Sequence, residues 1–195
     1  MKIGFVIGNG MSRSGFDLRK LFGLGTTYGC NAIHRDFSCS HVICTKRSHL
    51  VEAIEWNVNT KSYLWTTQKL SQAFLNPTIE LLPQPYPSTS KNDNHNKWTS
   101  IAYATLLASQ TNETVIFIGA DFIGRSVYSE SMNYPMEMFK DFSPHIEQII
   151  KIISNNTNVQ YVFINDSVND RLNAFTNKPN VSIDNYSNLE SMLLT

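Results

Sequence analysis

The chain has 195 residues, of which 42% are hydrophobic and only 16% are charged. That length suits one domain with a well-buried core, and the composition excludes a disordered, solvating chain. Lys and Arg together number 16, as do Asp and Glu, so the formal net charge is zero. A balanced charge supplies no long-range field for a nucleic-acid duplex, and it permits self-association into a homo-oligomer.

Three cysteines, Cys30, Cys39 and Cys44, stand in a chain without a recognisable secretory signal. An odd number of cysteines favours a reducing cytoplasm over a disulfide framework, so we expect a cytoplasmic protein. No apolar run approaches the ~20 residues of a membrane span. Histidines interleaved with the cysteines allow a zinc site, but the lack of closely spaced ligand pairs favours buried, metal-free cysteines.

Short runs of β-branched and aromatic residues alternate with helical stretches, a pattern that predicts an α/β fold. We expect one domain over residues 1–195, with a mostly parallel sheet and helices on both faces. The expected strands, in chain order, are residues 3–7, 26–30, 41–45, 63–66, 114–118, 159–164 and 181–183.

Four helices are expected, at residues 14–21, 98–110, 144–154 and 189–194. The third has isoleucines along one face, and Pro144 suits its first turn after a Ser143 cap. Residues 76–96 are rich in Pro, Ser and Asn and predict a long surface loop. This loop is either a lid over a site or a plain connection between two halves of one sheet.

A glycine turn follows the first expected strand directly, with the sequence Gly8-Asn9-Gly10-Met11-Ser12. Open α/β sheets bind ligands at the carboxyl ends of their strands, where glycine lets the backbone approach an anion closely. The NH groups of the turn, the next helix dipole and the Ser12 hydroxyl favour a phosphate. We therefore expect Gly8, Gly10 and Ser12 to bind a nucleotide phosphate, with Asn9 contacting base, ribose or phosphate. A ligand-free tight turn is the alternative; the spacing matches neither a dinucleotide fingerprint nor a P-loop.

Other polar residues stand at the ends of further strands. Asn31 follows the second strand, and we expect it to share a pocket with Asn9, or else to cap the next segment. Ser100 opens the helix at 98–110. Asp121 follows the strand at 114–118 and can orient a hydroxyl, hold a metal or anchor its own loop through backbone amides. Two loop tyrosines, Tyr128 and Tyr134, lie within reach of a phosphate at this edge.

The order of these motifs resembles the bacterial sialyltransferases of glycosyltransferase family 42 and a group of tailed-phage proteins related to them. The resemblance spans roughly residues 2–165, and its closer match is to the phage group, at residues 27–37. It rests on four pieces of sequence: residues 7–12, residues 30–31, Thr99-Ser100 with the helix that follows, and residues 116–122.

This resemblance implies a Rossmann-like fold and a cytidine monophosphate (CMP) sugar donor that is bound without a metal or a tightly bound cofactor. It implies that Tyr128 supports the departing phosphate and that His145 lies near the general base. A surface histidine at a helix start is the alternative for His145. The resemblance also implies that the donor is held by Gly8, Asn9, Gly10, Ser12, Asn31 and Ser100. Asp121, from its place at a strand end, is expected among the binding residues as well.

Two positions depart from the family pattern: Met11 replaces a proline, and Ile123 replaces a tyrosine whose hydroxyl contacts phosphate. The leading hypothesis is a nucleotide-sugar-dependent glycosyltransferase-like protein of phage origin, acting in the host cytoplasm. The alternative is a non-catalytic phage protein that sequesters a nucleotide or metabolite. Nucleotide hydrolysis and a structural virion role are weaker alternatives.

Overall fold

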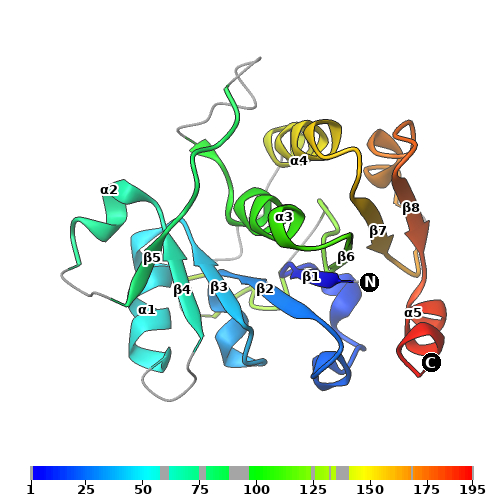
Figure 1. The fold of residues 1–195 in the computed structure, drawn as a ribbon. Helices are drawn as coiled ribbons and strands as arrows, with labels where there is room; N and C mark the ends of the chain where they lie inside the picture. Colours follow the sequence, from blue (N-terminus) through cyan, green and yellow to red (C-terminus); the bar gives the residue numbers. More distant parts are fainter. Residues whose placement is uncertain are drawn as a thin grey trace.

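A single sheet of eight strands forms the centre of the molecule (Figure 1), in the order β5-β4-β3-β2-β1-β6-β7-β8. The computed structural model describes residues 2–57, 62–74, 78–87, 97–123, 126–131, 133–134, 141–167 and 169–194. All neighbouring strands pair in parallel. The strands are β1 (Ile3–Ile7), β2 (Thr26–Cys30), β3 (His41–Cys44), β4 (Tyr63–Thr66), β5 (Ile79–Leu81), β6 (Thr114–Ile118), β7 (Gln160–Ile164) and β8 (Val181–Asp184).

Helices cover both faces of this sheet, which confirms the expected α/β architecture. Regular helices are α1 (Arg47–Asn57), α2 (Gln68–Ser71), α3 (Ser100–Thr111), α4 (Ser143–Asn155) and α5 (Tyr186–Leu193). Short 3₁₀ turns are η1 (Met11–Arg13), η2 (Leu18–Leu21), η3 (Asn31–Arg35) and η5 (Leu172–Ala174). In Figure 1, α3 and α4 lie on one face, and α1 and α5 lie on the other.

The direction in which the strands are added explains this division. From β1 to β5 the chain adds strands toward one edge, and after β5 it returns to the middle and adds strands toward the other edge. Because crossovers between parallel strands are right-handed, reversing the direction moves the connecting helices to the opposite face. The reversal falls between β1 and β6, the place where open α/β sheets bind ligands.

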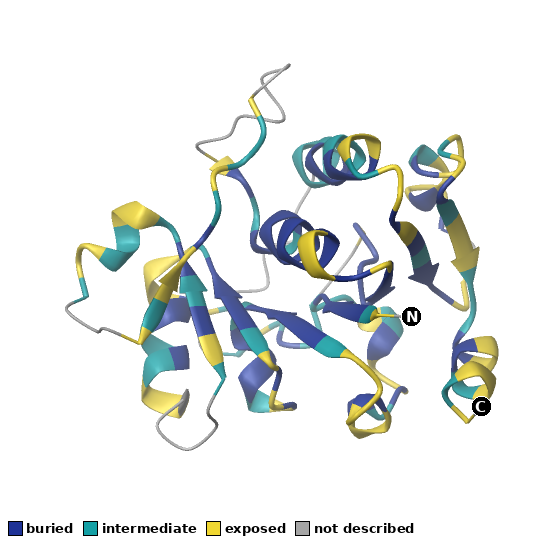
Figure 2. Cartoon of the chain, in the orientation of Figure 1, coloured by how far each residue is buried: buried dark blue, intermediate teal, exposed yellow. Residues whose placement is uncertain are grey.

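The buried central strands divide their side chains between two cores. Val6 and Phe117 point to the core beneath α3 and α4. Phe5, Ile7 and Ile118 point to the core that contains α1 and α5. Figure 2 shows the middle of the sheet and the inner side of α3 as buried, whereas edge strand β8 is largely exposed. Continuous apolar runs such as residues 114–118 therefore follow from burial on both faces.

Several expected elements differ from those observed. Within the helix expected at 14–21 only the 3₁₀ turn η2 is found, and neither α1 nor α2 was expected from sequence. Strand β5 lies inside the stretch expected to be a loop at 76–96, while residues 76–77 and 88–96 of that stretch lie outside the described residues. The Ser143 cap is wrong, because Phe142 is the N-cap and the Ser143 NH donates to the Asp141 carboxylate at 2.9 Å.

Glycine is required where the loops after β1 and β6 touch. A Cβ on Gly8 would lie 2.3 Å from the carbonyl oxygen of Gly119, and a Cβ on Gly10 would lie 2.4 Å from the Asp121 carboxyl carbon. Gly119 itself has a φ of 66°, in the left-handed region that glycine adopts freely. The two loops therefore approach one another more closely than side chains would allow.

We predict that Gly8→Ala lowers the free energy of unfolding by about 1–3 kcal/mol, the usual cost of forcing extra atoms into packed structure. Gly15→Ala is the matched control, because a Cβ there meets nothing within 4 Å. It should leave stability unchanged or raise it by up to about 1 kcal/mol, through reduced freedom of the unfolded chain. Urea unfolding measures both. Equal stability of the two variants would contradict the close approach.

Candidate functional site

The glycine turn after β1 is hydrogen-bonded to the loop after β6. The Gly8 NH donates to the Ile118 carbonyl and the Gly10 NH to the Gly119 carbonyl, both at 2.8 Å. The turn continues into η1, a three-residue 3₁₀ turn too short for an appreciable helix dipole. Two of the NH groups expected to face a phosphate thus have partners within the protein. Ligand binding at Gly8 and Gly10 stays a prediction.

Ser12 and Asp121 bind each other across the same two loops. The Asp121 carboxylate accepts the Ser12 NH at 2.8 Å and also the Ser12 hydroxyl. Asp121 is buried. Asp121 thus anchors the neighbouring loop after β1 through one backbone NH and one hydroxyl, and it is not shown to anchor its own loop. Its role toward a ligand stays a prediction.

Asn9 and the backbone beside Asn31 meet at one oxygen atom, the hydroxyl of Tyr134. The Asn9 Nδ2 donates to this hydroxyl at 3.0 Å and the Ala32 NH donates to it at 3.4 Å. The Asn9 Oδ1 is buried and has no hydrogen-bond partner among the described residues. The structure therefore places Asn9 and the start of η3 on one rim of the sheet, with Tyr134 between them.

The Asn31 side chain turns toward α3 instead of capping η3. Its Oδ1 accepts the Ser100 hydroxyl at 2.9 Å, and the Ser100 Oγ lies 2.9 Å from the Thr45 Oγ1. Cys30 is the N-cap of η3 and makes no side-chain cap bond, so the alternative of Asn31 as a cap is wrong. Asn31 has a φ of 55°, a conformation that asparagine tolerates better than most residues. Asn31 and Ser100 are thus brought together at the carboxyl ends of β2 and β3.

Tyr128 is buried and bonds to buried Arg13 and to the exposed Asp36. Its hydroxyl donates to the Asp36 carboxylate at 2.7 Å and accepts an Arg13 NH at 2.8 Å. Arg13 also pairs with Asp36 at 3.0 Å. Burial raises the pKa of Tyr128, which the Arg13 charge opposes and the Asp36 hydrogen bond reinforces. The hydroxyl expected to support a departing phosphate is therefore already donating to a carboxylate.

His145 lies in the first turn of α4, next to the first turn of α3. One turn further along α4, the Gln148 Oε1 accepts the Thr99 NH at 3.0 Å, which joins the two helix starts. Burial lowers the pKa of His145, the Asp141 charge opposes this shift and the Lys46 charge adds to it. The imidazole is therefore neutral at neutral pH and able to accept a proton.

A second ionic cluster, missed in the sequence, lies beside Tyr134. Arg35 donates to both oxygens of Glu52, with an Nη2–Oε2 distance of 2.8 Å, and to the Ser131 hydroxyl. The His49 ring stacks on Tyr134, with ring centroids 4.8 Å apart. Glu52 lies on α1, a helix that was not expected from the sequence, so its pairing with Arg35 was not expected either. Arg35 itself lies in the segment that resembles the phage group.

The cysteines are buried and free. Burial raises the pKa of Cys30 to about 12, so it stays a thiol. In the part of the chain that the structure describes, no group of three His, Cys, Asp or Glu side chains is placed to hold a metal ion. None of the described helices has the length and apolar character needed to span a membrane.

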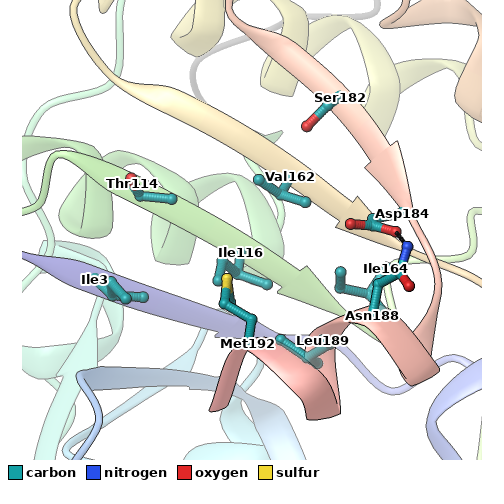
Figure 3. A pocket seen from close by; sticks show the side chains of 10 residues that line it. All are labelled: Ile3, Thr114, Ile116, Val162, Ile164, Ser182, Asp184, Asn188, Leu189 and Met192. Atoms are coloured by element: carbon teal, nitrogen blue, oxygen red, sulfur yellow. Dashed lines mark hydrogen bonds between the residues drawn. The ribbon is translucent and has the colours of Figure 1, made fainter. Parts of the chain in front are cut away.

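A cavity of about 140 Å³ lies away from this edge, between the sheet and α5 (Figure 3). Apolar side chains from β1, β6 and β7 form one wall, and Leu189 and Met192 of α5 form another. Asp184 and Asn188 beside it hydrogen-bond to each other at 2.7 Å. None of the candidate site residues lines this cavity.

Comparison with known proteins supports a relationship of fold. No family model matches the chain, and no curated protein matches it. A solved structure of a mutant α-2,3/8-sialyltransferase, CstII, is similar with a TM-score of 0.56 and 13% sequence identity. The match covers 83% of this chain and 81% of that chain. The chain therefore has a Rossmann-like fold similar to the fold of that sialyltransferase.

We predict that stability depends on the ionisation of Glu52. Burial raises the pKa of Glu52, but hydrogen bonds from Arg35 and Asn133 and the charges of Arg35 and His34 outweigh it, lowering the pKa to about 2. Because the pKa is lower in the folded state, the stabilisation is complete above the ordinary value of 4.5. It is lost as the pH falls from 4.5 toward about 2.

Glu52→Gln should lower the free energy of unfolding at pH 6 by about 1.5–3 kcal/mol, the range for hydrogen bonds to charged groups. It should also lose less stability than the wild type between pH 6 and pH 3. Urea unfolding at the two pH values measures both effects. Glu55→Gln, an exposed change on the same helix, controls for the loss of one negative charge. If Glu52→Gln lost as much stability as the wild type between pH 6 and pH 3, ionisation of Glu52 would not stabilise the fold.

Proposed function

We propose that this protein is a glycosyltransferase-like enzyme that binds a nucleotide sugar of the CMP-sugar type at the carboxyl edge of its sheet. Two neighbouring contacts carry the proposal: Asn9 and the Ala32 NH meet at the Tyr134 hydroxyl, and Asn31, the residue before Ala32, bonds to Ser100. The Asn9 Oδ1, which is buried and has no partner among the residues that the structure describes, adds an acceptor for a hydroxyl or amino group of a ligand. The sialyltransferase-like fold supports the same ligand class.

The proposed chemistry is direct displacement at the anomeric carbon of the donor sugar. His145 accepts the proton of an acceptor hydroxyl while that oxygen forms a bond to the anomeric carbon. The bond from this carbon to the phosphate oxygen breaks, and CMP leaves with the electron pair. The lowered pKa of His145 keeps the imidazole neutral for this task. Tyr128 supports the phosphate only if its hydroxyl leaves Asp36.

The partners of Tyr128 favour a second candidate function, a non-catalytic phage protein that sequesters a nucleotide. A hydroxyl held by Arg13 and Asp36 positions a loop without taking part in chemistry. Ile123, where the family has a tyrosine, is exposed and offers no hydroxyl. Under this proposal the same polar residues bind the nucleotide and no sugar is transferred.

We predict that Asn9→Ala and Asn31→Ala each weaken CMP binding by about 1–3 kcal/mol, because each change leaves buried polar partners unpaired. Isothermal titration calorimetry with CMP measures the change. Asn188→Ala on α5 is the control, because Asn188 lines the cavity and bonds to Asp184 at the end of β8, three strands away from β1. Unchanged affinity in both site variants would refute a shared nucleotide site.

A turnover assay separates the two proposed functions. Incubation with CMP-sugars and a mixture of sugar acceptors, followed by chromatography, should show CMP release by the wild type. His145→Ala should reduce this rate by about 10²–10⁴-fold, the usual contribution of a general base, while CMP affinity stays within about twofold. CMP binding without release in any mixture would refute the transferase and leave the sequestering protein.

A further inference from the structure

The Tyr134 hydroxyl stands where two NH donors from different parts of the chain converge. One donor is the Nδ2 of Asn9, a residue that follows β1, and the other is the NH of Ala32 in η3. Both donate to this one oxygen. The ends of β1 and β2 therefore position two NH donors, and Tyr134, which is distant in sequence, supplies the oxygen that accepts both.

The arrangement of these groups suits an oxygen that carries no proton. An oxygen that accepts two NH groups needs no hydrogen of its own, which describes a phosphate oxygen better than a hydroxyl. The Asn9 Oδ1 beside the two donors is buried and without a partner among the described residues. A nucleotide can pair with both kinds of group. Its phosphate can accept from the two NH donors, and its ribose or base can donate to the Asn9 Oδ1.

Burial in this position raises the pKa of Tyr134, which the hydrogen bond from the Ala32 NH opposes. The phenol therefore stays protonated and supplies a neutral oxygen to both donors. The Arg35 guanidinium carbon lies 5.8 Å from the centroid of the Tyr134 ring, and the Arg35 charge also opposes the rise in the pKa of Tyr134. An anionic oxygen in the place of the phenol would gain chiefly from the two NH groups, with this positive charge nearby.

We propose that Tyr134 is a displaceable plug whose hydroxyl occupies the place of a phosphate oxygen of the ligand. The proposal rests on the proposed nucleotide binding and adds the position of the phosphate: between the Asn9 amide in the glycine turn and the Ala32 NH at the start of η3. Binding exchanges the phenol oxygen for the phosphate oxygen, and the Tyr134 ring moves off His49.

The backbone around Tyr134 is anchored separately from its ring. The Tyr134 NH donates to the Ser131 carbonyl and the Tyr134 carbonyl accepts the Glu130 NH, both at 2.9 Å. The Ser131 hydroxyl in turn accepts from Arg35. The ring can therefore leave its place by rotation about its side-chain bonds while the turn that carries it keeps its hydrogen bonds.

Calorimetric titration of Tyr134→Phe and Tyr134→Ala with CMP, inorganic phosphate and cytidine tests the plug. Both variants should bind CMP and phosphate about tenfold more tightly than the wild type, because the ligand no longer competes with the phenol for the two donors. Cytidine, which has no phosphate, should show unchanged affinity. Tyr63→Phe, which removes an exposed phenol at the start of β4, should behave as the wild type.

The outcomes distinguish the plug from the nucleotide site. CMP binding that is unchanged or weaker in Tyr134→Phe and Tyr134→Ala would overturn the plug and leave nucleotide binding standing. Tighter phosphate binding in both variants without any CMP binding would support the plug and overturn the nucleotide site. An absence of binding by wild type and variants to all three probes would overturn both. Circular dichroism and thermal unfolding establish that each variant is folded.

Discussion

The direct contact between the loops after β1 and β6 is the constraint on which the rest of this edge depends. The Gly8 and Gly10 NH groups donate to carbonyls of the β6 side, and Ser12 donates to Asp121, so the pairing of two central strands continues beyond their ends. Only glycine allows the backbones to come so close. In open α/β sheets a ligand uses the crevice at the reversal of strand order. Here the protein's own hydrogen bonds span that place, and the candidate site lies toward β2 and β3.

The polar groups on that side are held in place by contacts between elements far apart in sequence. Asn31 adopts a left-handed backbone conformation that sends its side chain to Ser100 at the start of α3. Residues in sparsely populated conformations cost free energy and persist where surrounding contacts enforce them, often at functional sites. The convergence of Asn9, η3 and α3 is therefore organised by the fold around it, and Tyr134 completes it.

The electrostatics of the edge favour recognition by hydrogen-bond geometry over a strong net charge. Arg13 is paired with Asp36, and Arg35 with Glu52, so two guanidinium groups are largely neutralised within the protein. Burial lowers the pKa values of His49 and His145, which keeps both rings neutral near pH 7. A neutral His145 suits a proton acceptor, whereas the bound Tyr128 hydroxyl suits a structural anchor. This contrast underlies the two functions proposed for one site.

The sequence by itself determined the architecture and predicted the edge of the sheet at which the candidate site is sought. Apolar runs such as residues 3–7 and 114–118 can be buried on both faces only in a covered parallel sheet, and Asn9 and Asn31 directly follow two of its strands. Helix α1 and strand β5 were missed, because their weakly patterned sequences are stabilised by packing in the tertiary structure. Tertiary structure alone also decided which polar groups have partners. The Asn9–Tyr134 and Tyr128–Asp36 bonds join residues 125 and 92 positions apart, and no local pattern encodes such distant pairs.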